Sequence, residues 1–351
     1  MKKLFAILAA IALVGAFAAT TMAADWSFYG SARMQTWWET EGDNPATDEE
    51  MDMNWSQQGN SRFGARVAVN DNIAGRLEIG INDDNIAERL LYGTWNMGWA
   101  QLLVGQAYSP ANIFISNQVH GSDGNMLNFG GLYGGRQEML RLAWSGGWGS
   151  LQVAGLNPKD ATAAYVGTAN VDTVIPKFEG AYTFSGDMFW VTAVLGYQTF
   201  TVQDAADSDV DIDAMVYGVG GGVTLGAFYI NADVVGGLNM DAYGAWTETD
   251  ALPDYSTGSL EDTTSLGGQI ILGWTINDML KLEGGFGLIT SSNDTWAEDD
   301  SASAYYVQLP ITMAPGITIT PEIGLEDQMK DKNDVDEGNV TYFGAKWQIN
   351  F

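Results

Sequence analysis

Hydrophobic and polar residues alternate with a period of two in a series of segments along most of the chain. Successive side chains of a β-strand point to opposite faces, so this period indicates strands. Strand counts of 14 or 18 stay open, because the Gly-rich tenth and eleventh segments alternate least clearly. The sixteen segments are Trp26–Trp37, Asn60–Asn70, Ile73–Asn82, Arg89–Asn96, Trp99–Ala107, Arg136–Trp144, Gly149–Asn157, Ile175–Phe184, Met188–Thr201, Ile212–Thr224, Ala227–Gly237, Thr264–Ile276, Met279–Thr290, Ser303–Ala314, Ile317–Asp327 and Gly338–Phe351.

The last segment indicates how the sheet is closed. Every second residue from Phe343 to Phe351 is apolar, and the residues between them are mostly polar. In a soluble protein this aromatic strand would be an exposed edge. A closed barrel has no edge, because its last strand pairs with its first, here Trp26–Trp37. The pattern therefore favours an all-β barrel over the alternative, a half-buried edge strand of a soluble sandwich.

The connections between the segments alternate in length. Tight periplasmic turns and long extracellular loops are typical of transmembrane antiparallel barrels. The short connections are Asp71-Asn72, Met97-Gly98, Ser145–Trp148, Ser185–Asp187, Leu225-Gly226, Asn277-Asp278 and Pro315-Gly316. The long ones are Trp38–Gly59, Asp83–Glu88, Tyr108–Gly135, Pro158–Val174, Val202–Asp211, Leu238–Thr263, Ser291–Ala302 and Gln328–Glu337.

The apolar faces of the segments carry almost no charge, whereas the long connections hold most of the acids. Aromatic girdles at both membrane interfaces are expected of a barrel in lipid. Seven tryptophans lie near segment ends and fit such girdles: Trp37, Trp38, Trp95, Trp99, Trp144, Trp148 and Trp274. The sequence thus predicts a transmembrane β-barrel of about 16 strands.

The first 23 residues are typical of a secretory signal peptide. Lys2 and Lys3 precede the apolar run Leu4–Ala18, and small residues permit cleavage after Ala23 or, nearly as well, after Ala24. The run is shorter than the about 20 residues of a spanning helix. We therefore expect an exported protein with one domain, the barrel of residues 24–351, in the outer membrane.

Composition excludes several other classes. The chain has no Cys, which excludes a lipid anchor on Cys, a disulfide framework and a thiolate metal site. Two of the 15 Lys and Arg and none of the 44 acids precede residue 24, so the rest of the chain has a formal charge of −31. This charge argues against a nucleic-acid partner, because phosphates require a basic surface.

Six basic residues are predicted to face the inside of the barrel, since they alternate with apolar residues. They are Arg33, Arg62, Arg66, Arg76, Arg141 and Lys346. Once the last strand pairs with the first, all except Arg141 lie on neighbouring strands. Arginine stays charged and donates in a fixed geometry, which suits it to anionic groups. We predict a basic ladder that lines a pore; the alternative is that these residues pair with inward acids such as Glu78.

The longest connection, Tyr108–Gly135, differs from the others because it is rich in Gly and apolar residues, and Asp123 is its only carboxylate. A loop in water would not expose so many apolar side chains. We predict that it folds into the barrel and narrows the pore. The candidate constriction residues are Phe114, His120, Asp123 and Phe129. The alternative is an ordinary plug or surface flap.

The terminal strand, the alternating connections and the position of this loop resemble the general diffusion porins of Gram-negative bacteria. The likeness covers the whole chain after the signal peptide in architecture, and is specific in motif at the two ends and at the third long connection. It implies a 16-stranded trimer whose third loop folds inward, opposite basic residues of the wall. One departure is that third loops of this family usually carry several carboxylates, and here only Asp123 is available.

The sequence offers little for catalysis or metal binding. His120 is the only histidine, and although Ser122 and Asp123 follow it, adjacent loop residues seldom form a triad. The acids from Asp207 to Asp213 and in Asp331–Glu337 lack the spacing of a calcium loop. We expect no enzyme and no cofactor, beyond loose divalent cation binding by the acidic loops. An outer-membrane hydrolase would instead lose its activity in a His120→Ala variant.

These observations predict an outer-membrane porin that lets small hydrophilic solutes and ions diffuse passively through a water-filled pore. Its expected partners are membrane lipid, lipopolysaccharide, small solutes and, by resemblance, two further copies in a homotrimer. The acidic loops would concentrate cations at the mouth, whereas the ladder would favour anions at the narrowest point. Because charge at the mouth is screened within about 8–10 Å at physiological salt, we expect weak ion selectivity that leans towards cations only at low salt. The alternatives are a substrate-specific channel, for example for an oligosaccharide or an organic acid, and a structural or adhesive barrel.

Overall fold

The computed structural model describes residues 24–42, 51–82, 85–158, 171–203, 209–254 and 259–351. The expected signal peptide lies outside the described residues. The strands of the main sheet are β1 (Asp25–Gly42), β2 (Met51–Gln57), β3 (Arg62–Ala68), β4 (Ile73–Asn82), β5 (Asn85–Asn96), β6 (Gln101–Tyr108), β9 (Arg136–Gly146), β10 (Gly149–Leu156), β11 (Val171–Asp172), β12 (Lys177–Ser185), β13 (Phe189–Gln203), β14 (Asp209–Leu225), β15 (Phe228–Leu238), β16 (Thr264–Thr275), β17 (Lys281–Ser292), β18 (Asp300–Gln308), β19 (Ile311–Ala314), β20 (Ile317–Asp327) and β21 (Asn339–Asn350). Four short elements lie in connections: β7 (Asn112–Ile113), α2 (His120–Asp123), β8 (Leu132–Tyr133) and α3 (Met240–Tyr243).

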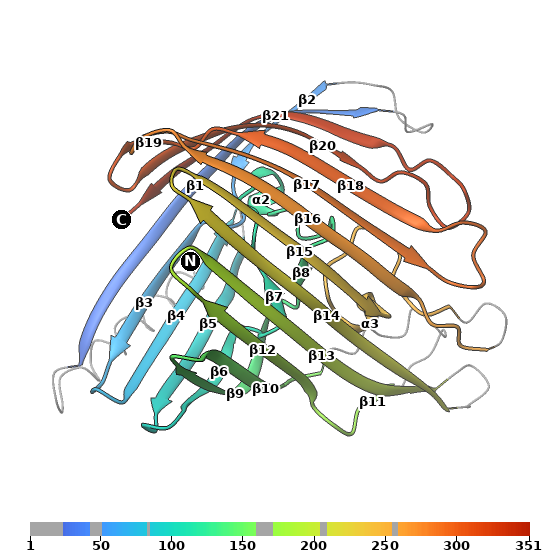
Figure 1. The fold of residues 1–351 in the computed structure, drawn as a ribbon, viewed down its shortest axis with the longest axis horizontal. Helices are drawn as coiled ribbons and strands as arrows, with labels where there is room; N and C mark the ends of the chain where they lie inside the picture. Colours follow the sequence, from blue (N-terminus) through green and yellow to red (C-terminus); the bar gives the residue numbers. More distant parts are fainter. Residues whose placement is uncertain (1–23, 43–50, 83–84, 159–170, 204–208, 255–258) are drawn as a thin grey trace.

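The main sheet closes into a barrel of 16 antiparallel strands (Figure 1). Within the described residues it has 19 segments. Three pairs of segments each count as one strand, because both members of a pair lie along the same neighbouring strand. These pairs are β2 and β3 along β1, β11 and β12 along β13, and β18 and β19 along β20. β1 pairs with β21 from Ser31 to Gly42, which joins the first strand to the last. The predicted all-β barrel, its strand number and its closure are therefore confirmed. Among the described residues no helix is both long and apolar enough to cross a membrane.

Alternation separates an apolar outer face from a mixed inner face. On β21, Trp347 is 46% exposed on the outside, whereas Tyr342 is fully buried on the inside. Large apolar side chains are exposed in the same way around the barrel, as lipid contact requires. The prediction that Trp37 belongs to the aromatic girdle is wrong. Its side chain is 1% exposed, because it shares the inward face of β1 with Arg33.

Two expected connections are also wrong. In the segment Trp38–Gly59, β1 continues to Gly42 and Met51–Gln57 forms β2, whose Met51, Met53 and Trp55 point outward. The alternation thus continues past the acidic run, part of which, 43–50, lies outside the described residues. In Asp83–Glu88, β5 already begins at Asn85 and pairs with Asn82, which leaves a two-residue connection instead of a long loop.

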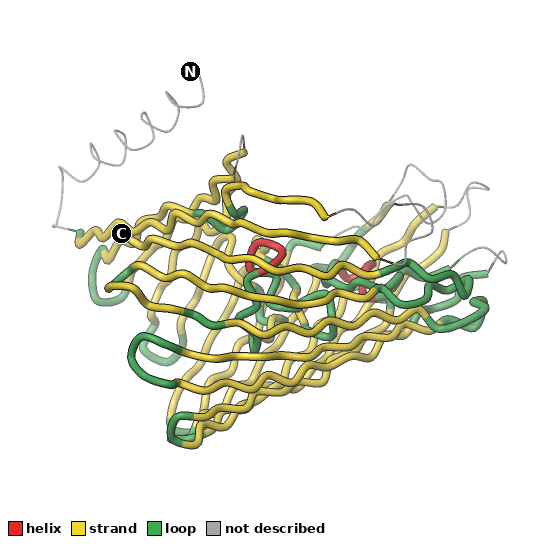
Figure 2. Tube along the Cα trace, turned by 90° about the horizontal axis from the view of Figure 1, so that it is seen from above, coloured by secondary structure: helices red, strands yellow, loops and turns green. Residues whose placement is uncertain are grey.

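The inside of the barrel is filled unevenly. Apolar inward residues of β12–β18 form one cluster with the third loop, Ser109–Gly135, and the sixth loop, Asn239–Thr263. Figure 2 shows α2 and α3 between the strands, within the ring that they form. The strands on the opposite side, β1, β3, β4, β5 and β9, carry the inward arginines. The candidate site is therefore the region between the third loop and this basic wall.

Candidate functional site

Buried glutamates of the barrel hold the backbone of the third loop. Glu179 on β12, Glu283 on β17 and Glu322 on β20 are each 4% exposed or less. A buried carboxylate needs hydrogen-bond donors, and the backbone N–H groups of the loop supply them. The bonds are Ala111 N to Glu179 Oε2 (2.8 Å), Asn117 N to Glu283 Oε1 (3.1 Å), Val119 N to Glu322 Oε2 (2.8 Å) and His120 N to Glu322 Oε1 (3.0 Å). The loop is thus attached to well-separated strands of the inner wall.

Glycines on the facing strands let the third loop come close. A Cβ atom on Gly218 or Gly220 of β14 would stand 2.9 or 2.6 Å from the side chain of Ile113. A Cβ on Gly287 of β17 would collide with the carbonyl oxygen of Phe129. Phe129, a candidate constriction residue, is accordingly only 5% exposed and packs on the wall. Of the two Gly-rich segments that weakened the strand prediction, Ile212–Thr224 is therefore part of the docking surface of the loop.

His120 lies between aromatic rings and carboxylates. Its ring stacks on Tyr342 at 3.7 Å and meets Trp37 edge-on at 5.4 Å. Its Nδ1 is 3.0 Å from Glu326 Oε1 and its Nε2 is 3.1 Å from Glu39 Oε1. Burial lowers the pKa of His120, but the hydrogen bonds to the two glutamates outweigh burial and raise the pKa to about 9. His120 is therefore a cation at neutral pH that ties the loop to β1 and β20.

Asp123 connects the end of α2 to the first and last strands. Its carboxylate forms an ion pair with Arg33 of β1 and a second one with Lys346 of β21, at 2.6 Å. Asn60 also donates to Asp123 Oδ2 at 3.3 Å. Two of the six predicted ladder residues therefore meet the single carboxylate of the third loop.

Three arginines surround one buried carboxylate on the basic wall. Glu78 of β4 is 1% exposed and accepts from Arg89 Nε at 2.8 Å and Arg76 Nη2 at 2.9 Å, while Arg62 Nη1 lies 3.6 Å away. Of the predicted ladder residues, Arg62 and Arg76 therefore follow the alternative interpretation, in which the basic residues pair with an inward acid. One carboxylate cannot neutralise three guanidinium groups, so this cluster keeps a positive surplus.

Arg89 is a member of this cluster that sequence reasoning missed. Its alternation with Leu91, which is 52% exposed on the outside, would place Arg89 outside as well. The register of β4 and β5 shifts between Glu78 and Ile79, and this bulge turns Arg89 inward. No local sequence signal marks the bulge.

Arg66 and Arg141 are the remaining residues of the predicted ladder. Arg66 lies directly opposite Arg76 on the neighbouring strand, an arrangement that is unfavourable for like charges. Tyr29 lies beside both, with its ring centroid 4.9 Å from the Arg66 guanidinium and 5.3 Å from that of Arg76. Arg141 lies on β9, next to none of the other five, and its buried Nε has no hydrogen-bond partner among the described residues.

The sixth loop also folds inside, which sequence reasoning did not predict. Met240 and Tyr243 of α3 are fully buried, and the Tyr243 hydroxyl donates to Glu179 Oε1 at 2.7 Å. Trp246 N donates to Tyr133 O of the third loop at 3.3 Å. The signal that could have found this loop is the high proportion of apolar residues from Leu238 to Trp246, interrupted by Asn239, Asp241 and Gly244.

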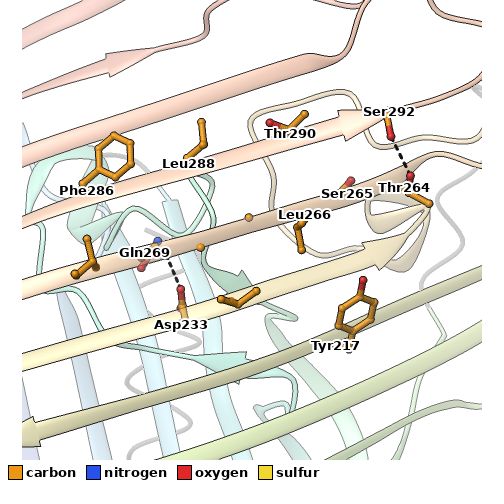
Figure 3. A pocket seen from close by; sticks show the side chains of 14 residues that line it. Tyr217, Asp233, Thr264, Ser265, Leu266, Gln269, Phe286, Leu288, Thr290 and Ser292 are labelled. Atoms are coloured by element: carbon orange, nitrogen blue, oxygen red, sulfur yellow. Dashed lines mark hydrogen bonds between the residues drawn. The ribbon is translucent and has the colours of Figure 1, made fainter.

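A groove on the outside of the barrel is distinct from this site. Figure 3 shows the side chains of Tyr217, Leu266, Phe286 and Leu288 around this groove. Its floor is the stretch of β16 where Gly267 and Gly268 carry no side chain. The large side chains around it belong to the outer, apolar face, and the inner sides of β16 and β17 contact the third loop. We assign no function to this groove.

The described parts of the acidic loops show no metal centre. Among the described residues, no three His, Cys, Asp or Glu side chains converge as metal ligands. Asp211 accepts from Thr201 at 2.6 Å and Asp213 from Tyr197 at 2.6 Å, while Asp207 lies outside the described residues.

Comparison with solved structures identifies the architecture. The outer membrane channel DcaP of Acinetobacter baumannii matches with a TM-score of 0.75 and 16% identity, over 93% of this chain and 97% of that one. OmpF of Salmonella typhi matches with a TM-score of 0.66 and 12% identity, over 92% and 97%. The anion-selective porin from Comamonas acidovorans matches with a TM-score of 0.63 and 12% identity, over 93% and 100%. No model of a protein family and no curated protein matches the sequence.

At these identities the likeness concerns the fold. It extends over nearly the whole of both chains. The chain therefore has the closed 16-stranded fold of Gram-negative outer-membrane porins, as the resemblance in its sequence implied.

Proposed function

We propose that the protein is an outer-membrane porin through which small hydrophilic solutes and ions diffuse passively. The observation that carries this proposal is the uneven interior: apolar packing and the third loop occupy the side of β12–β18, while charged arginines line the other side. Arginines facing a dry core would be costly, whereas arginines facing a water-filled pore are not. The pore would run between the third loop and the basic wall.

Within this proposal, the basic residues have two roles. Arg33 and Lys346 hold the third loop through Asp123, which makes them anchors of the constriction. Arg62, Arg66, Arg76 and Arg141 would line the pore opposite the loop, whose Phe114 is 46% exposed, while Arg89, at 5% exposure, supports them through Glu78. The surplus of guanidinium groups over the single Glu78 changes the expected selectivity from weakly cationic to anionic at the narrowest part. The Comamonas porin with the same fold is itself anion-selective.

The membrane context follows from the same proposal. Residues 1–23 would direct export and be removed, and the apolar exterior would contact lipid. Lipopolysaccharide, bridged by loosely held divalent cations, would contact the acidic loops. A homotrimer is the proposed assembly, since one solved OmpT structure with this fold is a trimer form. Chemical cross-linking of the purified protein tests the assembly.

Conductance of the purified protein in a planar lipid bilayer tests the channel. We expect discrete, long-lived current steps and a reversal potential that favours anions at low salt. An Asp123→Ala variant, which releases the third loop from Arg33 and Lys346, should give noisier steps. A folded barrel with negligible conductance would contradict the porin and favour the adhesive alternative. Saturable block by one solute class would favour a substrate-specific channel.

A further inference from the structure

Four aromatic side chains form a continuous row at the base of the third loop. This aromatic row consists of Tyr108 at the end of β6, Phe114, Tyr133 on β8 and Trp246 of the sixth loop. The ring of Phe114 lies 5.7 Å from that of Tyr108 and 5.9 Å from that of Tyr133, and Trp246 lies 4.4 Å from Tyr133. The row joins the barrel wall to both inward loops.

Two rings of the row, Phe114 and Trp246, are exposed. Phe114 is 46% exposed and Trp246 is 47% exposed. The residues on either side of Phe114, Ile113 and Ile115, are 2% and 3% exposed, because they face the wall. The loop thus buries its aliphatic side and presents Phe114 on its free side. Both exposed rings contact Tyr133, and exposed aromatic rings on segments folded inside a barrel are available to a solute there.

Guanidinium groups lie at the same end of the loop. Arg136 stacks over the ring of Tyr108 at 5.5 Å, and its Nη1 donates to the Tyr108 hydroxyl at 3.4 Å. Arg89 Nη2 donates to the same hydroxyl at 3.3 Å. Among the described residues, no carboxylate lies within ion-pair distance of Arg136, and Arg89 shares Glu78 with two other arginines. Cationic and aromatic surfaces therefore adjoin each other at Tyr108.

We propose that this place selects organic anions that carry an aromatic ring. The ring of the solute would stack on Phe114 or Trp246, and its carboxylate would bind the guanidinium group of Arg136, because Arg89 is only 5% exposed and already bonded to Glu78, Asn60 and Tyr108. A simple inorganic anion would use only the guanidinium group, and an uncharged aromatic solute only the rings. The inference rests on the proposed channel, and it names the solute class that the same pore would retain longest.

Block of single-channel current tests the proposal with matched solutes. Benzoate carries both a ring and a charge, acetate lacks the ring, and benzyl alcohol lacks the charge. We expect benzoate to occupy the pore about 2- to 10-fold longer than acetate, the range that one aromatic pair provides. In a Phe114→Leu/Trp246→Leu variant, which keeps apolar volume but removes both rings, benzoate should fall to the level of acetate. Arg136→Gln should shorten occupancy by benzoate but not by benzyl alcohol.

A calorimetric titration of benzoate into the detergent-purified barrel separates this inference from the channel itself. Binding that weakens in the double variant, without any conductance, would refute the porin and retain the aromatic-anion site. Normal conductance with equal block by benzoate and acetate, or with benzoate block unchanged in the double variant, would overturn the site and leave the porin intact.

Discussion

The cluster around Glu78 permits a quantitative test of the basic wall. Replacement of Glu78 by Gln keeps the shape of the side chain but removes the carboxylate that, among the described residues, bonds Arg76 and Arg89 at 2.9 and 2.8 Å and lies 3.6 Å from Arg62. The variant adds one net positive charge to the proposed pore lining. Removal of one partner from a buried ionic cluster costs about 3–5 kcal/mol, so folding must be verified first.

The size of the effect follows from Coulomb's law. A unit charge about 8 Å from a permeating ion contributes about 0.5 kcal/mol in water. Debye screening reduces this to about 0.4 kcal/mol at about 0.01 M salt and about 0.2 kcal/mol at about 0.1 M. An anion gains what a cation loses. The permeability ratio of anion to cation should therefore rise about fourfold at the lower salt and about twofold at the higher.

Reversal potentials across a potassium chloride gradient measure this ratio. Glu138→Gln is the matched control, because it removes the same charge from an exposed side chain of β9 that bonds to Asn157 at 3.2 Å. Heat-dependent gel mobility and circular dichroism show whether each barrel is folded. An unchanged ratio at both salt concentrations in a folded Glu78→Gln barrel, or an equal shift in the control, would refute a pore lined by this cluster.

Three further predictions concern the attachment of the third loop. Asp123→Asn should leave the buried cations Arg33 and Lys346 without their carboxylate and increase protease cleavage in the loop, whereas a loop held by backbone bonds alone would be cleaved as before. Because the pKa of His120 is raised from 6.5 to about 9, its contribution of about 3 kcal/mol to stability is present below pH 6.5 and lost as the pH rises through 9. Current noise should therefore increase over this range. A His120→Gln variant that keeps the same pH dependence would contradict this prediction. Gly287→Val should displace Phe129 from the wall and change the single-channel conductance, whereas Gly147→Val, at an open turn position, should not; equal conductance in both variants would count against the docking.

The period-two pattern determined most of the fold. Alternation is a local property, because adjacent strand residues point to opposite faces whatever the rest of the chain does. It therefore located the strands and predicted which residues of β21 face inward and outward. The predicted bounds of one strand, Ile317–Asp327, are those observed for β20. The closure of β1 on β21 followed, since an aromatic last strand cannot remain an edge. The composition of the third loop, apolar and poor in acids, likewise indicated a buried position.

The tertiary structure alone decided which charges meet. Arg33 and Asp123 are 90 residues apart, and Asp123 and Lys346 are 223 apart, so no local pattern relates them. Arg89 faces inward only because a bulge shifts the register of β4 and β5, and one extra residue reverses the face of every side chain beyond it. The inward course of the sixth loop depends in the same way on partners supplied by distant strands, such as Glu179. Sequence periodicity thus determined the barrel, whereas contacts between distant segments decided how its interior is divided.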